Sequence, residues 1–282
     1  QHSVKELRSL GIGPDVLVCR SEQELPNEEK NKIALFCSVP NDNVISMHDV
    51  ETVYSIPLLL YKQKVDEIIL KKLKIKTKKP NLNDWKRVIK AKLHPVKEVN
   101  VSFVGKYTEL KDSYKSINEA LEHAGIQNKA KVNINFVEAE KITPKNVKRI
   151  LKQSDAVLVP GGFGERGVEG MITACKYARE NNVPYLGICL GMQVAIIEYA
   201  RHVLKLKSAN STEFDIETPF PVIGLITEWS DISGKKEKRN INSDLGGTMR
   251  LGGQVCELKK GSNSFKMYKN SKIIERHRHR YE

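Results

Sequence analysis

The sequence has no long hydrophobic run, few aromatic residues and no paired cysteine motif. No apolar run approaches the ~20 residues that a helix needs to cross a bilayer, and no signal-peptide pattern opens the chain, so neither a membrane span nor a secretory leader is expected. The five cysteines are irregularly spaced and form no CxxC pair, which argues against a zinc site and favours a reducing, cytoplasmic setting. With 40% hydrophobic residues over 282 positions, we expect a soluble protein with two buried cores.

Basic residues outnumber acidic ones in the sequence, 47 to 34. The formal net charge is +13, and much of it lies in three clusters at residues 71–79, 235–239 and 276–280. A balance of this kind can indicate nucleic-acid binding. However, aromatic residues make up only 6% and no DNA- or RNA-binding motif is present, so a solvated lysine-rich surface is the better interpretation. No nucleic-acid partner is expected, although local clusters could serve phosphorylated small molecules.

Short apolar runs alternate with helical patterns from the start of the chain. In the first part, strands are expected at residues 15–19 and 44–45, and helices at 27–36, 56–60 and 65–73. Asp49 is expected to cap a helical start at residues 50–54. The stretch 74–93 is basic and contains proline, which indicates a linker. The alternation predicts α/β architecture.

A second domain is expected from about residue 98. Its predicted strands lie at residues 99–104, 132–137, 155–159 and 183–186, and its predicted helices at 113–124, 170–180 and 192–197. Thr143 and Pro144 are expected to open another helix as N-cap and first-turn proline. The repetition predicts a doubly wound parallel sheet with its sites at the carboxyl ends of the strands.

Residues 187–191, Gly-Ile-Cys-Leu-Gly, lie between a predicted strand and a predicted helix. A nucleophile flanked by small residues at such a junction is typical of a nucleophile elbow, where the tight turn admits only glycine. The free thiol pKa of about 8.5 can be lowered by a helix N-terminus. Cys189 is therefore a candidate for covalent acyl chemistry, and a buried structural cysteine is the alternative.

Attack of a thiol on a carbonyl needs N–H donors for the developing oxyanion. The turn Pro-Gly-Gly-Phe-Gly at residues 160–164 ends the preceding predicted strand, so it should lie beside the elbow. Its N–H groups, together with that of Leu190, could form the oxyanion hole. A loop bend or a phosphate cradle would also explain the glycines.

These motifs resemble those of the class I glutamine amidotransferases, and within them the CTP synthase family. The likeness extends over residues 160–164, 187–193, 210–214, 244–252 and 275–282, and also over 1–7 and 32–37 in the first part. The resemblance implies the end of a P-loop-type synthetase domain at residues 1–75, a linker at 76–97 and a C-terminally incomplete amidotransferase domain at 98–282.

The resemblance also implies a reaction: ATP and Mg²⁺ activate UTP, and ammonia released from glutamine converts it to CTP. Cys189 would attack the glutamine amide. The residues implied in the oxyanion hole and glutamine site are Gly162, Leu190, Gly191, Met192, Gln193, Glu213 and Arg280. Without the family pattern, Gln193, Glu213 and Arg280 would be ordinary surface side chains. No metal ligand is assigned in this chain.

For nucleotides, the resemblance implies contacts of Gln1 and Lys32 with UTP or CTP, and of Val50 with ATP. Arg239 and Arg250 are candidates for binding the activator GTP, and a charged loop without a ligand is the alternative. A homotetramer and feedback by CTP are also implied. The expected location is the cytoplasm, without a membrane.

Two elements of the family pattern are absent from the sequence. No GxxxxGK[ST] phosphate-binding loop occurs, and no His-Pro-Glu triplet follows the thiol. His202, His277 and His279 are the histidines after Cys189, and none matches the family's base. We therefore expect an internal fragment that makes no CTP by itself. The alternatives are a nonenzymatic remnant or assembly module, another class I amidotransferase, or a γ-glutamyl hydrolase.

Overall fold

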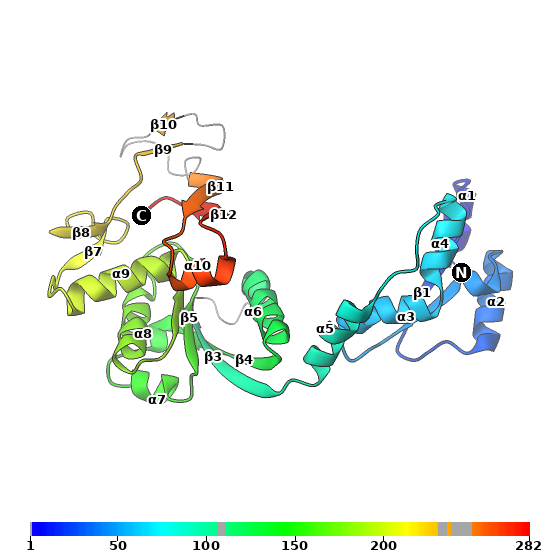
Figure 1. Cartoon of the computed structure of the whole chain (residues 1–282), viewed down its shortest axis with the longest axis horizontal. Helices are drawn as coiled ribbons and strands as arrows, with labels where there is room; N and C mark the ends of the chain where they lie inside the picture. The colour runs from blue at the N-terminus through cyan, green and yellow to red at the C-terminus, as the bar shows by residue number, and fades with distance from the viewer. Residues whose placement is uncertain (1, 107–110, 231–235, 239–249) are drawn as a thin grey trace. The chain divides into compact units, whose positions relative to one another are not determined.

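The computed structural model describes residues 2–106, 111–230, 236–238 and 250–282, apart from some side chains at the edges of these ranges. The chain divides into two compact units (Figure 1). Unit 1 comprises Gln1–Glu98 and Leu121–Lys131, and unit 2 comprises Val99–Ala120 and Val132–Glu282. The segment 121–131 belongs to unit 1 by its contacts, whereas the sequence places it in the second domain. The boundaries drawn from the sequence remain a prediction.

Unit 1 is built around two parallel strands, β1 (Leu17–Ser21) and β2 (Val44–His48). Its helices are α1 (His2–Ser9), α2 (Asn27–Cys37), η1 (Asn41–Asn43), η2 (Val53–Ser55), α3 (Ile56–Lys62), α4 (Val65–Leu73) and α5 (Asn83–Leu93). α2 packs against the strands through a small core formed by Ala34, Cys37, Val39 and Val44. A strand–helix–strand connection with parallel strands is what the apolar runs of the sequence predict.

Two local expectations for unit 1 differ from the structure. The prediction that Asp49 caps a helix at residues 50–54 is wrong, because η2 begins at Val53 and the side chain of Thr52 accepts from the Tyr54 N–H. Asp49 instead lies 3.6 Å from the Arg20 guanidinium. The stretch expected as linker contains helix α5, and its Trp85 donates a hydrogen bond of 2.7 Å to the Tyr54 carbonyl.

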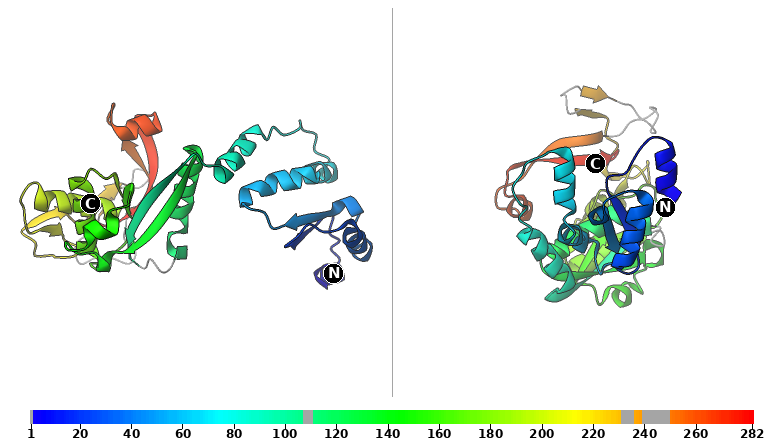
Figure 2. Two further views of the ribbon diagram at one scale, coloured as in Figure 1. Left: turned by 90° about the horizontal axis from the view of Figure 1, so that it is seen from below. Right: turned by 90° about the vertical axis from the view of Figure 1, so that its right-hand side faces the viewer.

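Unit 2 contains a four-stranded sheet in the order β4-β3-β5-β6. The strands are β3 (Lys97–Gly105), β4 (Ala130–Glu138), β5 (Ala156–Val159) and β6 (Tyr185–Gly187). β5 pairs in parallel with both β3 and β6, so the central strand has the predicted direction. Figure 2 shows β3 and β4 as two long strands side by side.

Helices and smaller sheets complete unit 2. The helices are η3 (Lys111–Tyr114), α6 (Lys115–Gln127), which continues into unit 1, η4 (Ala139–Lys141), α7 (Val147–Leu151), α8 (Val168–Glu180), α9 (Leu190–His202) and α10 (Asn263–Tyr268). The strand pairs are β7 (Ala209–Ser211) with β8 (Phe220–Ile223), β9 (Glu228–Ser230) with β10 (Lys236–Lys238), and β11 (Arg250–Glu257) with β12 (Lys272–His279). The last two pairs are antiparallel, which the prediction of a parallel sheet did not include.

The core of unit 2 lies between the sheet and helices α8 and α9. Val157 and Val159 of β5 are fully buried, as are Leu190 and Val194 of α9. They belong to one cluster that also contains Met171 of α8. Burial of this kind explains the continuous apolar run of β5, since the central strand of a parallel sheet is covered on both faces.

The predicted helix start at Thr143 and Pro144 is wrong. α7 begins at Val147, preceded by Asn146. The Thr143 N–H donates to Asn146 Oδ1 at 2.8 Å, and the Asn146 side chain donates to the Lys141 carbonyl at 2.8 Å. The short polar side chain thus closes a turn over these residues, and α7 follows directly after it.

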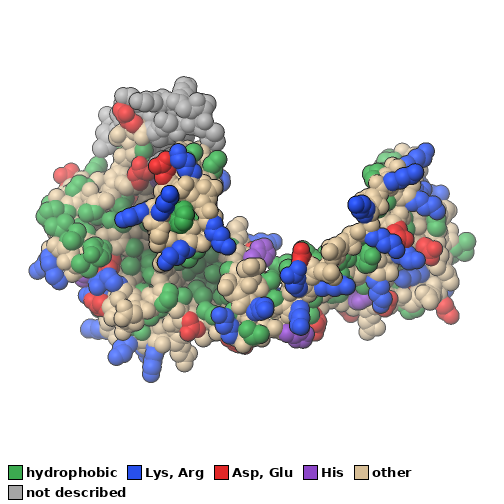
Figure 3. All heavy atoms as spheres, in the orientation of Figure 1, with side chains coloured by type: hydrophobic (Ala, Val, Ile, Leu, Met, Phe, Trp, Pro, Cys, Tyr) green, Lys and Arg blue, Asp and Glu red, His purple; other side chains and the backbone are tan. Residues whose placement is uncertain are grey.

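Basic side chains are spread over the visible surface among acidic and polar ones (Figure 3). Within the described ranges, none of the helices combines the length and the apolar character required to span a bilayer.

Candidate active site

The predicted nucleophile elbow forms at the junction of β6 and α9. Cys189 immediately precedes α9 and has φ 52° and ψ −105°. A positive φ is uncommon for a residue with a side chain and costs about 1–3 kcal/mol, so it persists only where the surroundings enforce it. Such strain is typical of the nucleophile in an elbow.

The two glycines of the elbow are required by close backbone packing. A Cβ on Gly187 would lie 2.4 Å from the carbonyl carbon and oxygen of Gly191. A Cβ on Gly191 would lie 2.1 Å from the Val159 carbonyl oxygen, although real Cβ contacts are essentially never below 3.0 Å. Glycine at these positions lets α9 start directly against β5 and β6.

The glycine-rich turn at residues 160–164 lies beside the elbow, as the sequence predicts. A Cβ on Gly161 would be 3.4 Å from Cys189 Cβ, and a Cβ on Gly162 would be 3.3 Å from the side chain of Leu190. The Ile188 N–H donates to the Val159 carbonyl at 2.9 Å, which holds the two segments together. Gly162 and Leu190, both expected to donate to an oxyanion, are therefore neighbours.

The thiol is half-buried, and its environment affects its pKa in two directions. Burial is the largest effect and raises the pKa of Cys189, while a hydrogen bond from the Leu190 N–H lowers it and the charge of Glu213 raises it. The expected effect of the helix N-terminus is therefore present, but burial outweighs it. The sulfur also lies 3.9 Å from the Arg278 carbonyl.

A pocket of about 230 Å³ opens over the thiol between the start of α9 and strand β12. Its lining includes Cys189, Met192 and Gln193, together with residues 275–279 and Tyr281. Gln193 is only 4% exposed and donates a hydrogen bond of 2.6 Å to the Tyr281 carbonyl. The structure therefore places the expected nucleophile and two residues expected at the glutamine site around one cavity.

Glu213 and Arg280 contact the glycine-rich turn beside the thiol. The Glu213 carboxylate accepts a hydrogen bond of 2.8 Å from the Gly164 N–H. The Arg280 guanidinium lies over the Phe163 ring, 5.6 Å from its centroid. Neither residue lines the cavity over the thiol.

The three histidines after the thiol occupy two different places. His202 ends α9, where its Nδ1 lies 3.3 Å from the Glu198 carboxylate. His277 and His279 line the cavity over Cys189, and His279 Nε2 lies 3.1 Å from Glu282 Oε2. They fall within residues 275–282, which resemble the family, and neither was expected to be the base.

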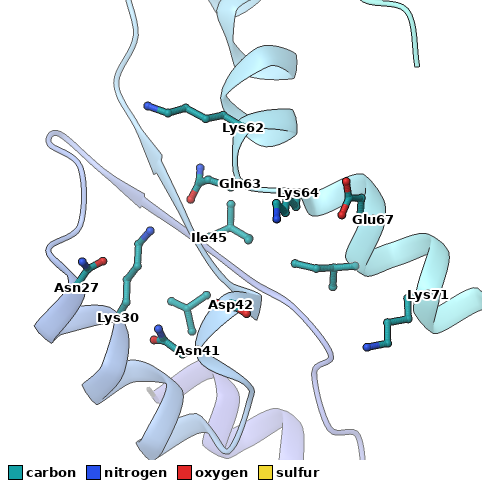
Figure 4. Close-up of a pocket in the computed structure, with 12 residues that line it drawn as sticks. Asn27, Lys30, Asn41, Asp42, Ile45, Lys62, Gln63, Lys64, Glu67 and Lys71 are labelled. Atoms are coloured by element: carbon teal, nitrogen blue, oxygen red, sulfur yellow. The ribbon is translucent and has the colours of Figure 1, made fainter. Parts of the chain in front are cut away.

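Two of the residues expected to bind nucleotides, Lys32 and Val50, lie on different parts of unit 1, in α2 and after β2. Lys32 is exposed and pairs with Glu29 at 3.2 Å, and Val50 follows the end of β2. Figure 4 shows a different pocket of about 440 Å³, lined by α2, η1, β2, α3 and α4, which includes neither of them. Gln1 and Arg239 lie outside the described residues. Arg250 begins β11 opposite His279, and its side chain is not described.

Two side chains that the sequence did not single out support the site. Tyr185 donates a hydrogen bond of 2.7 Å to the Gly191 carbonyl in the first turn of α9. Lys106 contacts the glycine-rich turn from the end of β3. The position of Lys106 directly after a buried strand was the one available signal, because sites gather at the carboxyl ends of parallel strands.

Replacing Tyr185 with phenylalanine should destabilise unit 2 by about 1 kcal/mol, because the buried Gly191 carbonyl loses the hydrogen bond from the Tyr185 hydroxyl. The measurement is denaturant unfolding of the whole chain. Tyr199→Phe, at a half-exposed position of α9, is the control and should change stability by less than about 0.5 kcal/mol. Equal stability of the two variants would contradict the prediction.

Comparison with known protein families agrees with this geometry. The model described as glutamine amidotransferase class-I matches residues 109–282, and the model described as CTP synthase N-terminus matches residues 1–75. The chain belongs to the CTP synthase family. The match of residues 1–75 separates this chain from class I amidotransferases that carry other partner domains, and from γ-glutamyl hydrolases.

A solved structure from the same family is also similar. It is described as the glutaminase domain of Trypanosoma brucei CTPS with bound acivicin, and it is 37% identical in sequence. The likeness covers 65% of this chain and 67% of that one, with a TM-score of 0.56. CTP synthases are glutamine-hydrolysing ligases, and the residues matched by the amidotransferase model include the thiol elbow of unit 2.

Proposed function

We propose that Cys189 is the nucleophile that releases ammonia from glutamine for the amination of UTP to CTP. The observation that carries the proposal is the strained thiol at the start of α9, with Gly162 and Leu190 beside it. A nucleophile and two N–H donors in one place are what acyl transfer needs.

In the proposed reaction the thiolate of Cys189 attacks the side-chain amide carbon of glutamine. The new S–C bond forms, and the charge on the amide oxygen develops towards the N–H groups of Gly162 and Leu190. The C–N bond then breaks, ammonia leaves with one added proton, and a glutamyl thioester remains. Water cleaves the thioester to glutamate and restores the thiol. We assign no residue as the base.

Recognition of glutamine is part of the proposal. Glu213 suits the α-ammonium group and Arg280 the α-carboxylate, because charged partners make the strongest hydrogen bonds. Gly191, Met192 and Gln193 form the first turn of α9 beside the thiol. One amide N–H of Gln193 donates to the Tyr281 carbonyl, so its second N–H and its oxygen are the groups that a ligand would use.

The nucleotide part of the proposal rests on membership of the CTP synthase family. We propose UTP and ATP as substrates, CTP as a feedback ligand, GTP as activator and a homotetramer as the assembly. Exposed Lys32 offers a cation to a triphosphate. Within the described ranges, no group of three or more His, Cys, Asp or Glu side chains suits a metal ion, so no step is assigned to Mg²⁺. All five cysteines are free, which supports a cytoplasmic location.

The proposal is tested by labelling with acivicin, followed by mass mapping of all five cysteines. Cys189 should be labelled at least about tenfold faster than the others, and excess glutamine should protect it. Cys175 is an internal control, because burial raises the pKa of its thiol to about 12 and makes it unreactive. Uniform or absent labelling would refute the proposal and favour the nonenzymatic alternative.

The pH dependence of alkylation is a separate prediction. Because the pKa of Cys189 is raised, its reactive thiolate becomes abundant only at high pH, and the rate with iodoacetamide should still increase above pH 9. Glu213→Gln removes a charge that raises this pKa, so its rate profile should shift to lower pH. A wild-type rate that is constant from pH 8 upwards would contradict the prediction.

A further inference from the structure

Lys106 is a buried cation next to the candidate oxyanion hole. It follows the last residue of β3, Gly105, and is only 5% exposed. An ammonium group loses its hydration on burial and is stable there only if polar groups replace the water. Burial indeed lowers the pKa of Lys106, while the nearby charge of Glu213 raises it.

The partners of this ammonium group belong to the glycine-rich turn. Lys106 Nζ donates a hydrogen bond of 3.0 Å to the Phe163 carbonyl and another to the Gly164 carbonyl. The Tyr114 hydroxyl in turn donates to the Lys106 carbonyl, so the backbone of the lysine is itself held. One side chain therefore fixes two successive carbonyls of the turn.

The same turn is held from two other sides. The Gly164 N–H donates to the Glu213 carboxylate, and the Gly164 carbonyl accepts from Lys106. The peptide groups before and after Gly164 therefore both have a charged partner. At the start of the turn, the Pro160 ring packs closely on Gly105. A Cβ on Gly105 would lie only 3.2 Å from Cγ of this ring. Gly162 lies between these two anchored ends.

We propose that Lys106 is a positioning residue for glutamine hydrolysis. By holding the Phe163 and Gly164 carbonyls, it fixes the peptide planes of the turn so that the Gly162 N–H is directed at the oxyanion. This inference rests on the proposed role of Cys189. A donor in an oxyanion hole acts only when its direction is set before the reaction, and one such donor is worth a factor of about 10²–10³ in rate.

The test measures inactivation of the whole chain by a glutamine-analogue diazo ketone, with the maximal rate kinact and the half-saturating concentration KI determined separately. In Lys106→Met, kinact should fall at least tenfold while KI changes less than threefold. The rate with iodoacetamide, which needs no oxyanion hole, should stay within twofold. Lys106→Arg, which retains a charged donor, should recover part of kinact.

Lys152→Met, at an exposed lysine that directly follows α7, is the matched control and should behave as the wild type. If Lys106→Met does not fold, Lys106→Ala takes its place, because it also removes both the donor and the charge. A kinact within twofold of wild type in the neutral variant would overturn the positioning role. Failure of the wild type to react at Cys189 would instead refute the proposed function, and the positioning role with it.

Discussion

Replacing Gly191 with alanine is expected to abolish labelling of Cys189 by acivicin and to lower the free energy of unfolding by about 3 kcal/mol. The added Cβ would lie 2.1 Å from the Val159 carbonyl oxygen, so α9 must move away from β5. Overpacking of a core costs about 1–3 kcal/mol, and an overlap with rigid backbone belongs at the upper end of that range. The displaced helix also carries the Leu190 N–H away from the thiol.

Gly224→Ala is the control for this variant. Its Cβ would have no neighbour within 4 Å, and its φ is not in the left-handed region. It should therefore have wild-type labelling and unchanged or slightly higher stability. The measurements are denaturant unfolding and the rate of mass gain at Cys189. Rapid labelling of Gly191→Ala would show that the tight turn is not needed to activate the thiol.

Arg179→Met should have a comparably large effect on stability, about 2–4 kcal/mol. Arg179 of α8 donates to both oxygens of Glu198 of α9, and the Glu198 side chain is only 1% exposed. Removing the cation leaves a buried carboxylate with His202 as its neighbour at 3.3 Å. Breaking a buried pair costs about 3–5 kcal/mol, and the value is reduced here because Arg179 reaches solvent.

A double-mutant cycle separates the ion pair from packing. Arg179→Met with Glu198→Leu removes both charges, so it should recover much of the stability lost in Arg179→Met alone. Glu180→Ala is the control, since Glu180 is an exposed second partner of Arg179 and should cost less than about 0.5 kcal/mol. The measurement is equilibrium unfolding in denaturant. No recovery in the double variant would mean that lost packing, not the unpaired charge, caused the effect.

Much of the active-site region could be predicted from the sequence because its determinants are local. Apolar runs bounded by glycine predict β5 and β6, and the spacing of Gly187 and Gly191 around Cys189 predicts the elbow. The same reasoning failed at Asp49 and Thr143, where Thr52 and Asn146 compete for the same role. Where several short polar residues lie close together, each could cap the helix, and helix-capping propensity alone does not select one of them.

The sequence by itself predicted the elbow around Cys189, its two flanking glycines and the neighbouring glycine-rich turn. The tertiary structure decided the pKa of the thiol, the anchoring of the turn by Lys106 and Glu213, and the approach of β12 to Cys189. The reason is physical. A backbone turn depends on residues adjacent in the chain, whereas burial and charge depend on segments that meet only when the sheet is formed. Lys106 and Gly164 are 58 positions apart in sequence, and only folding brings the ammonium group to the carbonyl.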